Sequence, residues 1–244
     1  DYKVLVKSLY ANAQSVQVYG GEDAATPDYG KVYISIKAKS GSNLTEVTKT
    51  SLVQSLKSFA VASVTPVIID PETTFITLTT TFKYDSSLTT KDVSTLETNV
   101  VEAITGYNTD TLENFTGMFR YSAVGKTIDD ADSSILSNIT KVKMYKYITP
   151  TLSSGLKYTL SFNNAFYNPH SGHNSSAGGI VSSTGFKINN DSSTNEHFLD
   201  DDGAGNIRVY YLSGTTRIYT DSTFGTINYT TGEIILTSAN ITSI

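Results

Sequence analysis

The sequence has no cysteine and no tryptophan among its 244 residues, and only three arginines. The absence of cysteine excludes disulfide bonds and thiolate metal sites. Charged residues make up 17% of the chain and the formal net charge is -5, which argues against a basic surface for nucleic acid. No apolar run approaches the ~20 residues of a membrane span, and no signal peptide is recognisable. Nucleic acid and the membrane interior are therefore not expected as partners.

The residues that are present indicate a folded, strand-rich protein. The chain has 16 tyrosines and 10 phenylalanines, and it is rich in threonine, which favours strands. Its length suits one large domain or two smaller ones with their own cores. Residues 1–5 read as the inside of a helix and no initiator methionine precedes them, so we expect the chain to be part of a longer polypeptide.

Residues 1–150 alternate between helical and strand patterns. We expect helices at about 2–10, 44–59, 91–104 and 112–129, and strands around 16–18, 32–36, 67–69, 73–84 and 140–148. The second helix should bury Leu52, Leu56 and Phe59. The third should bury the stripe Val93, Leu96, Val100, Ala103 and Ile104, with Thr89 or Thr90 as its N-cap. This pattern predicts an α+β domain, a mixed sheet with helices packed on it.

After Pro150 the helical periodicity ends, and residues 151–244 read as a small all-β domain. Alternating runs separated by Gly, Asn, Asp and Ser occur at 157–162, 179–188, 207–212, 217–219, 226–229 and 234–236. Gly232 should supply the left-handed position of the turn that joins the last two runs. The polar stretch 163–177 is expected to be a long exposed loop.

Motifs for nucleotide or metal chemistry are weak. Gly125-Lys126-Thr127 resembles the end of a phosphate-binding loop, but Arg120 stands where the first glycine is needed and the segment looks helical. His170 and His173 have a spacing seen in metal sites, yet no carboxylate ligand is near them in sequence, so an exposed loop pair is the favoured interpretation. His197 is expected to be a surface strand residue.

The best candidate for a cation site is the acidic stretch from Asp200 to Asn206. Calcium loops of the EF type need oxygen ligands at fixed positions, and Ala204 and Tyr211 stand where two of them should be. We therefore favour a tight acidic hairpin turn that leads into the strand 207–212. No metal and no cofactor are predicted.

No catalytic residues are predicted either. The chain has no Gly-x-Ser-x-Gly elbow and only three histidines. The paired acids Glu22-Asp23 and Asp129-Asp130 could act as glycosidase carboxylates, but a sequence without tryptophan lacks the usual sugar platforms, and adjacent acids are normally solvated. A hydrolase is thus the weakest hypothesis.

Several stretches together resemble the baseplate-J-like family of contractile injection systems. In detail, they are similar to the C-terminal portion of the baseplate wedge subunits of T-even-type contractile-tailed phages. The stretches that carry the resemblance are 16–23, 29–36, 67–71, 119–122, 128–129, 141–142, 198–203 and 225–236.

This resemblance implies a non-enzymatic structural protein of the virion tail baseplate, assembled in the host cytoplasm. Such wedge subunits form a ring around the central hub, hold the tail in a strained state and rearrange during contraction. The implied partners are further copies of the chain, other wedge subunits, and hub or sheath-initiating proteins.

An exposed loop with a Gly-Gly turn is the predicted contact with neighbouring subunits. Its residues are Tyr19, Gly20, Gly21, Glu22, Asp23 and Pro27. An alternative function is a carbohydrate-binding or adhesin-like β-rich surface module, which the C-terminal β domain, its Asn- and Tyr-rich loops and the acidic turn would suit.

Overall fold

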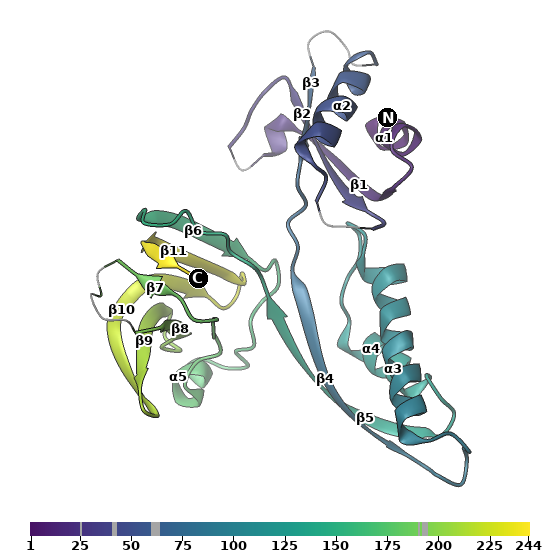
Figure 1. Ribbon diagram of the computed structural model, residues 1–244, viewed down its shortest axis with the longest axis vertical. Coiled ribbons are helices and arrows are strands. Elements are labelled where there is room, and N and C mark those ends of the chain that lie inside the picture. Colours follow the sequence, from purple (N-terminus) through teal and green to yellow (C-terminus); the bar gives the residue numbers. More distant parts are fainter. Residues whose placement is uncertain (25, 41–42, 60–63, 190, 192–194) are drawn as a thin grey trace. The chain divides into compact units, whose positions relative to one another are not determined.

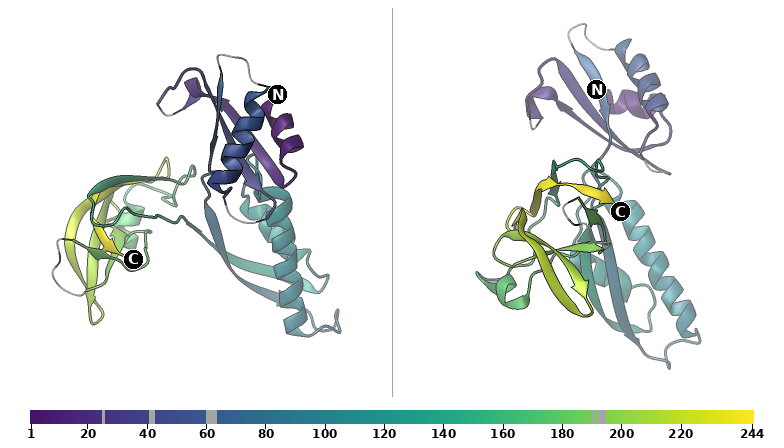
Figure 2. Two further views of the ribbon diagram at one scale, coloured as in Figure 1. Left: turned by 45° about the horizontal axis from the view of Figure 1, so that its top comes forward. Right: turned by 60° about the vertical axis from the view of Figure 1, so that its left-hand side comes forward.

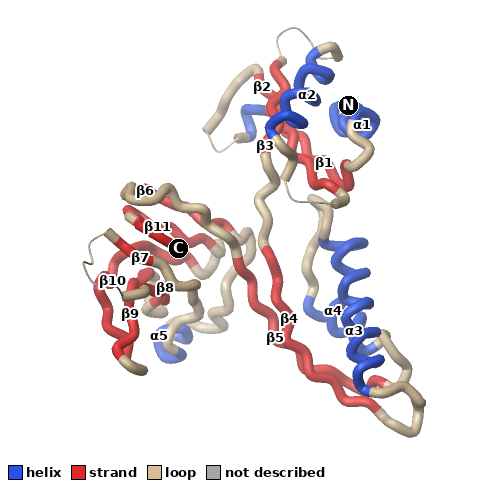
Figure 3. Tube along the Cα trace, viewed as in Figure 1, coloured by secondary structure: helices blue, strands red, loops and turns tan. Residues whose placement is uncertain are grey.

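The computed structural model describes residues 1–24, 26–40, 43–59, 64–189, 191 and 195–244. It divides the chain into two compact units (Figure 1). Unit 1 comprises Asp1–Thr73 and Thr77–Lys143, and unit 2 comprises Thr74–Ile76 and Met144–Ile244. Helices are concentrated in unit 1, whereas unit 2 is built mainly from strands (Figure 3).

The first part of unit 1 is a three-stranded sheet with two helices. Its elements are α1 (Tyr2–Leu9), β1 (Ala13–Gly20), β2 (Lys31–Ala38), α2 (Glu46–Lys57) and β3 (Thr65–Ile69). In the order β1-β2-β3, β1 and β2 are antiparallel, with Val18 opposite Ile34, and β3 is parallel to β2. The crossover between β2 and β3 contains α2, as a parallel connection requires.

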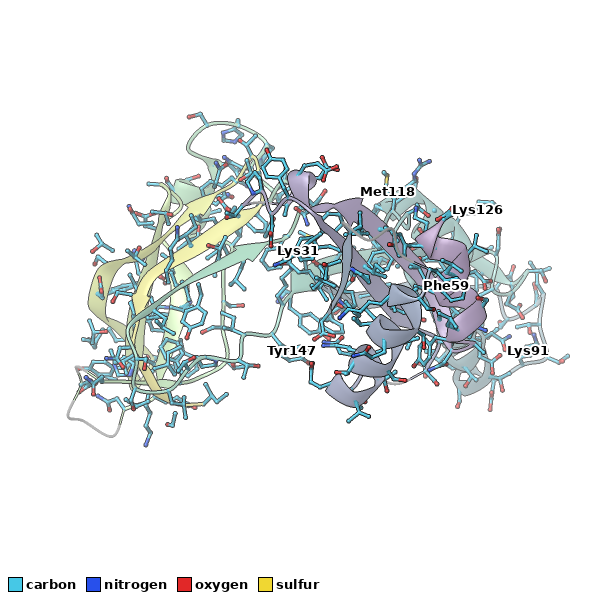
Figure 4. The ribbon with its side chains drawn as sticks, turned by 90° about the horizontal axis from the view of Figure 1, so that it is seen from above. Lys31, Phe59, Lys91, Met118, Lys126 and Tyr147 are labelled. Atoms are coloured by element: carbon cyan, nitrogen blue, oxygen red, sulfur yellow. The ribbon has the colours of Figure 1, made fainter. Side chains whose placement is uncertain are left out.

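One hydrophobic cluster holds these elements together. Ile34 and Ile36 of β2 are buried with Val6 of α1 and with Leu52 and Leu56 of α2. Helix α2 begins after Thr45, whose hydroxyl accepts a hydrogen bond from the amide of Thr48. The predicted stripe of this helix was wrong at one position. Phe59 lies beyond the end of α2 and is 60% exposed (Figure 4).

The second part of unit 1 is a helix pair beside a two-stranded sheet (Figure 2). Its elements are β4 (Phe75–Tyr84), α3 (Val93–Tyr107), the π-helical turn η2 (Asn108–Leu112), α4 (Tyr121–Asp129) and β5 (Ile135–Tyr145). The buried residues Val100, Val124, Ile128 and Ile135 form the core, with Leu78 and Phe82 of β4 packed against it.

Four predictions for this part are corrected, two of them here. The expected helix 112–129 is interrupted, since the chain leaves its helical path after Leu112 and resumes at Tyr121. Between them, the amide of Gly117 donates to Asn114 O, and a Cβ at Gly117 would lie 2.4 Å from Thr111 O. Helix α3 is capped by Asp92 rather than by Thr89 or Thr90.

The other two corrections concern the exposure of Val93 and the start of strand β5. Val93 begins α3 but is 47% exposed instead of buried. Strand β5 begins at Ile135, five residues before the predicted start. The hydroxyls of Thr80 and Thr140 lie 3.1 Å apart, and the amide of Asp85 donates to Ser134 O. These two contacts show that β4 and β5 run antiparallel.

Unit 2 contains a five-stranded antiparallel sheet in the order β6-β11-β10-β9-β8. The strands are β6 (Leu156–Ser161), β8 (His197–Asp201), β9 (Asn206–Ser213), β10 (Thr216–Asn228) and β11 (Glu233–Ala239). A second, two-stranded sheet pairs β7 (Lys187–Ile188) with β12 (Ile241–Ser243). The fully buried side chains include Ile207, Val209 and Leu236.

The strand predictions for unit 2 need four corrections. The runs 217–219 and 226–229 belong to one strand, β10, whose pairing with β9 shifts register twice. The run 179–188 contains only the short β7, and β8 was not predicted. The stretch 163–177 is not entirely an exposed loop, because it contains α5 (His173–Ala177) with Asn174 buried. Gly232 has the predicted positive φ, 70°.

The predicted fold class is confirmed as an α+β part followed by an antiparallel β part. The single mixed sheet expected for residues 1–150 is replaced by two separate sheets, β1-β2-β3 and β4-β5. The proposed domain limits, 1–150 and 151–244, stay a prediction.

Candidate interaction surfaces

The predicted contact loop follows β1 directly. Tyr19 and Gly20 end the strand, and Gly21, Glu22 and Asp23 form a 3-10 turn, η1. Glu22 and Asp23 are exposed, as is Pro27 further along the loop, while Gly21 is buried. Ala25 lies outside the described residues. Glu22 and Asp23 are thus exposed on η1, and Pro27 is exposed further along the chain, so their role as a contact stays a prediction.

The base of this loop is tightly fastened. The carbonyl of Gly21 accepts hydrogen bonds from the amides of Ala24 and Asp28. A Cβ at Gly21 would lie 1.8 Å from Asp28 O, so only glycine fits there without a backbone shift. The Asp28 carboxylate lies 2.7 Å from Lys31 Nζ and accepts from the Tyr33 hydroxyl. Hydrogen bonds from Lys31 and then Tyr33 hold the pKa of Asp28 below its usual value.

The acidic stretch of unit 2 ends β8 with Asp200 and Asp201 and continues into the hairpin turn that leads to β9, as the hairpin interpretation predicted. Asp200 is 2% exposed. Its carboxylate accepts from Arg208 Nε at 2.9 Å, Arg217 Nη1 at 2.6 Å and the Tyr219 hydroxyl at 2.8 Å. The two guanidinium groups also stack on aromatic rings, Arg208 over Tyr219 and Arg217 over Tyr210.

Asp201 is completely buried and fully hydrogen-bonded. Its Oδ1 accepts from the amides of Ile180 and Val181 at 2.6 and 2.7 Å. Its Oδ2 accepts from the amide of Gly203 and, at 2.5 Å, from the Tyr229 hydroxyl. Burial and this hydrogen bond raise the pKa of Tyr229.

Asp202 completes the turn. It accepts from the amides of Ala204 and Asn206 and from the side chain of Asn206. Each of the three carboxylates is therefore occupied by donors of the chain itself. No group of three or more potential metal ligands occurs among the residues that the structure describes. The acidic stretch is a structural brace of unit 2, and its geometry offers no open ligand positions for calcium.

The histidines have different environments. His170 Nε2 lies 3.2 Å from His173 Nδ1, and the ring of Tyr167 contacts His173 edge-on. His170 is exposed in a loop, as predicted, but the prediction was wrong for His173, which begins α5 and is only partly exposed. The prediction for His197 was wrong, because this residue is 1% exposed in β8, with Nε2 3.0 Å from Asp191 Oδ2.

The segment that resembles a phosphate-binding loop lies inside a helix. Gly125, Lys126 and Thr127 belong to α4, where the Thr127 hydroxyl donates to Ala123 O. Lys126 is exposed (Figure 4), and its ammonium group forms an ion pair with Asp130. A helix interior offers no cradle of free backbone amides, so this segment cannot bind phosphate in the manner of such a loop.

Two further surface features were not predicted. Phe75 at the start of β4, Tyr145 at the end of β5 and Tyr147 all fall within unit 2, and their rings contact one another with centroids 5.1 to 5.5 Å apart. A shallow depression of about 510 Å³ lies over β10 and β11 and is lined by polar groups including Asn168, Asn228 and Glu233. The alternating pattern of residues 73–84 indicates that one face of this strand, which includes Phe75, is exposed. The sequence pattern does not show which residues from distant parts of the chain lie beside Phe75 on that face.

Comparison with known proteins now gives the assignment. The family model described as baseplate structural protein gp6, C-terminal domain I, matches residues 1–69. The model of C-terminal domain III of the same protein matches residues 72–147. The chain belongs to the baseplate structural protein gp6 family. The two matched ranges correspond to the two parts of unit 1, each with its own hydrophobic cluster.

A curated relative of this gp6 chain is the baseplate wedge protein gp6 of Enterobacteria phage T4. The two are 30% identical over 164 residues, which cover 65% of this chain and 24% of the relative. The chain therefore spans about a quarter of the length of the relative that it matches. The family assignment confirms the predicted resemblance to phage baseplate wedge subunits and the expectation of a structural rather than enzymatic protein. No helix in the described part of the chain is both long and apolar enough to cross a membrane.

Proposed function

We propose that this chain is a wedge subunit of a contractile phage tail baseplate, that it associates with further copies of itself, and that it rearranges during contraction. The family match over residues 1–69 and 72–147 carries the proposal. The partners are other wedge subunits, with hub or sheath-initiating proteins as further contacts.

The surface chemistry supports an assembly role. The carboxylates of the acidic stretch bind donors within unit 2, so they are not available to a partner. The charged and apolar side chains that a partner could contact lie elsewhere on the surface. Large exposed side chains include Val101 at 61%, Met118 at 63% and Ile139 at 69% exposure. Exposed apolar side chains beside free charges suit interfaces that form after folding. The division into two compact units is compatible with a subunit whose parts reorient.

Within this function, the loop from Tyr19 to Pro27 is a contact with a neighbouring subunit. Because hydrogen bonds already hold the base of this loop in place, Glu22 and Asp23 should lose little conformational freedom when they bind a partner. The variant Glu22→Lys/Asp23→Lys should weaken association while leaving folding unchanged. Association equal to that of the wild type would remove this loop from the interface.

The mass of the chain in solution tests self-association directly. Light scattering at increasing concentration should show a mass that rises above 26.4 kDa. Rearrangement is tested in assembled baseplates, by cysteine pairs introduced into the cysteine-free chain. Pairs in the two units should cross-link differently before and after contraction, and identical cross-links in both states would contradict the proposal.

Glycan binding is a second candidate because of one observation. The depression over β10 and β11 combines amides, hydroxyls and the Glu233 carboxylate in a concave polar surface. A glycan array probed with the chain would decide this. Binding that Glu233→Gln abolishes would favour the surface-module function, and an array without signal would leave the baseplate function alone.

A further inference from the structure

A tight turn in unit 2 places His170 beside His173. The amide of His173 donates a hydrogen bond to the carbonyl of His170 at 3.1 Å, which closes a four-residue β-turn. Gly172, the third residue of this turn, has φ 76° and ψ -1°. These are the values of a type II turn, which favours glycine at that position. The turn thereby brings the two imidazole rings into contact.

Each ring directs one nitrogen toward the other. His170 Nε2 and His173 Nδ1 are 3.2 Å apart, and the rings are nearly perpendicular, with centroids 4.9 Å apart. In a four-coordinate metal site with bonds of about 2.0–2.1 Å, two adjacent nitrogen ligands lie about 2.9 Å apart in square-planar geometry and about 3.3 Å apart in tetrahedral geometry. The separation of the two nitrogens therefore suits the binding of one ion by both.

The main chain fixes the tautomer of His170. Its Nδ1 lies 3.1 Å from Ser171 O, and because a carbonyl oxygen only accepts hydrogen bonds, Nδ1 carries the proton. The Nε2 atom of the neutral ring then has a free lone pair on the side of His173. Histidines that bind metals are commonly oriented in this way, by a hydrogen bond from the nitrogen that does not touch the ion.

His173 is held by a well-packed element. It begins α5, in which Asn174 is completely buried and the Ser175 hydroxyl donates to Gly203 O at 3.0 Å. A Cβ at Gly203 would lie 2.2 Å from Ser175 N, so α5 packs directly against the turn that follows β8. His170 is exposed and His173 partly so. An ion can thus reach the pair from solvent, and its binding should cost little conformational freedom.

We propose that His170 Nε2 and His173 Nδ1 bind a late first-row divalent transition metal ion such as Zn²⁺. Imidazole nitrogens suit zinc, copper and nickel, whereas calcium and magnesium prefer oxygen ligands. Since no group of three or more potential ligands occurs in the described part of the chain, water completes the shell of the ion. The site is separate from the acidic stretch, and the proposal is independent of the baseplate role.

Binding exchanges a hydrogen bond for two metal bonds. Without the ion, His173 Nδ1 donates its proton to the lone pair of His170 Nε2. With the ion, this proton is carried by Nε2 of His173 after exchange with solvent, and both facing nitrogens give their lone pairs to the metal. The ion thus links the loop that carries His170 to α5, and it should stabilise the folded chain because the unfolded chain does not hold the two rings together.

Zinc titration of the whole chain tests the site. Isothermal titration calorimetry should show one bound Zn²⁺ per chain and no binding of calcium or magnesium. The variants His170→Ala and His173→Ala should each bind zinc at least about tenfold more weakly. The matched control is Ser171→Ala, which lies between the histidines and keeps the backbone carbonyl that orients His170, so it should bind like the wild type. Circular dichroism verifies that each variant is folded.

Two further measurements locate the ion and its effect. NMR of isotope-labelled imidazole nitrogens should show that zinc shifts His170 Nε2 and His173 Nδ1 and leaves the buried His197 unchanged. Zinc at about five times its Kd should raise the unfolding temperature of the wild type by about 2–4 °C. The same zinc concentration should not stabilise His170→Ala.

Three results would overturn the inference. A wild-type chain that binds no zinc would refute the site. Zinc binding that persists in both histidine variants would place the ion elsewhere. Zinc shifts confined to the opposite nitrogens, His170 Nδ1 and His173 Nε2, would refute the assigned geometry. The baseplate role is unaffected by any of these results, because it depends on the family match and not on metal binding.

Discussion

The acidic stretch of unit 2 and three exposed charged residues of unit 1 serve opposite purposes. In unit 2, Asp200 and Asp201 are buried and their oxygens are occupied by arginine, tyrosine and backbone donors. In unit 1, Glu97, Lys141 and Lys143 are exposed and unpaired within the described residues. The acidic cluster that stands out in the sequence is thus internal, and the charges available to partners are dispersed along the chain.

The difference follows from the cost of burying charge. A carboxylate loses its hydration when it is buried, and only hydrogen bonds or ion pairs offset that loss. Asp201 meets this condition with four donors. A lysine or glutamate on the surface keeps its water, so it needs no internal partner and can be used by another subunit.

The largest expected effect comes from breaking the brace of unit 2. Asp201→Ala leaves the amides of Ile180 and Val181 and the Tyr229 hydroxyl without their acceptor. Since each orphaned buried donor costs on the order of 1–3 kcal/mol, the free energy of unfolding should fall by about 3–5 kcal/mol. Urea denaturation followed by tyrosine fluorescence measures this loss.

The matched control is Asp23→Ala, an exposed acid of unit 1. It should change the free energy of unfolding by less than about 0.5 kcal/mol. If both substitutions lowered the free energy of unfolding equally, the buried Asp201 would contribute no more to stability than the exposed Asp23, which would contradict the comparison.

A smaller effect is expected at the base of the exposed loop. In Gly21→Ala, the new Cβ would overlap the carbonyl of Asp28, so the backbone must shift at a cost of about 1–3 kcal/mol. Gly106→Ala is the control, because a Cβ at that position in α3 meets nothing within 4 Å. It should stabilise the chain by about 0.5–1 kcal/mol through helix propensity. Thermal unfolding of both variants gives the two opposite signs.

Acid should weaken unit 1 because it protonates two carboxylates, Asp92 and Asp132, that accept hydrogen bonds there. Hydrogen bonds from the side chain and amide of Thr95 lower the pKa of Asp92, and the ion pair with Lys91, followed by hydrogen bonds from Ser134, lowers that of Asp132. Their stabilisation is complete above about pH 5. It decreases as the pH falls from the unfolded pKa, about 3.9, through the lower folded values.

The measurement is the unfolding temperature of the wild type and of Asp132→Asn between pH 7 and pH 3. The variant should unfold at a lower temperature than the wild type at pH 7. The difference between the two unfolding temperatures should decrease toward pH 3, where the wild type loses the same interaction. A gap that stays constant with pH would contradict the role assigned to the charge of Asp132.

The last prediction is that calcium has no effect on the stability of the chain. Calcium should leave the unfolding temperature unchanged, because chain donors already occupy the carboxylates of Asp200, Asp201 and Asp202. Differential scanning calorimetry with millimolar calcium or with chelator checks this. A calcium-dependent increase would revive the cation-site interpretation and with it the alternative of a surface module.

Sequence patterns located most of the secondary structure where periodicity was long and regular. Helix α1 and the hairpin β1–β2 agree closely with the prediction, as does the turn at Gly232. Errors occurred where a tertiary contact overrides local propensity. The helix predicted across Gly117 breaks because that glycine lies against the Thr111 carbonyl, and β8 escaped notice because its pairing partner β9 was needed to define it.

The sequence by itself determined the class of fold, the exclusion of cysteine chemistry and the resemblance to baseplate wedge subunits, because composition, periodicity and motif similarity are local properties. Only the tertiary structure decided what individual charged residues do. The burial of Asp201 and the exposure of Lys141 depend on strands and helices that lie far apart in the chain. Burial and hydrogen bonding between such distant elements arise only when the chain folds, and no sequence window contains both partners.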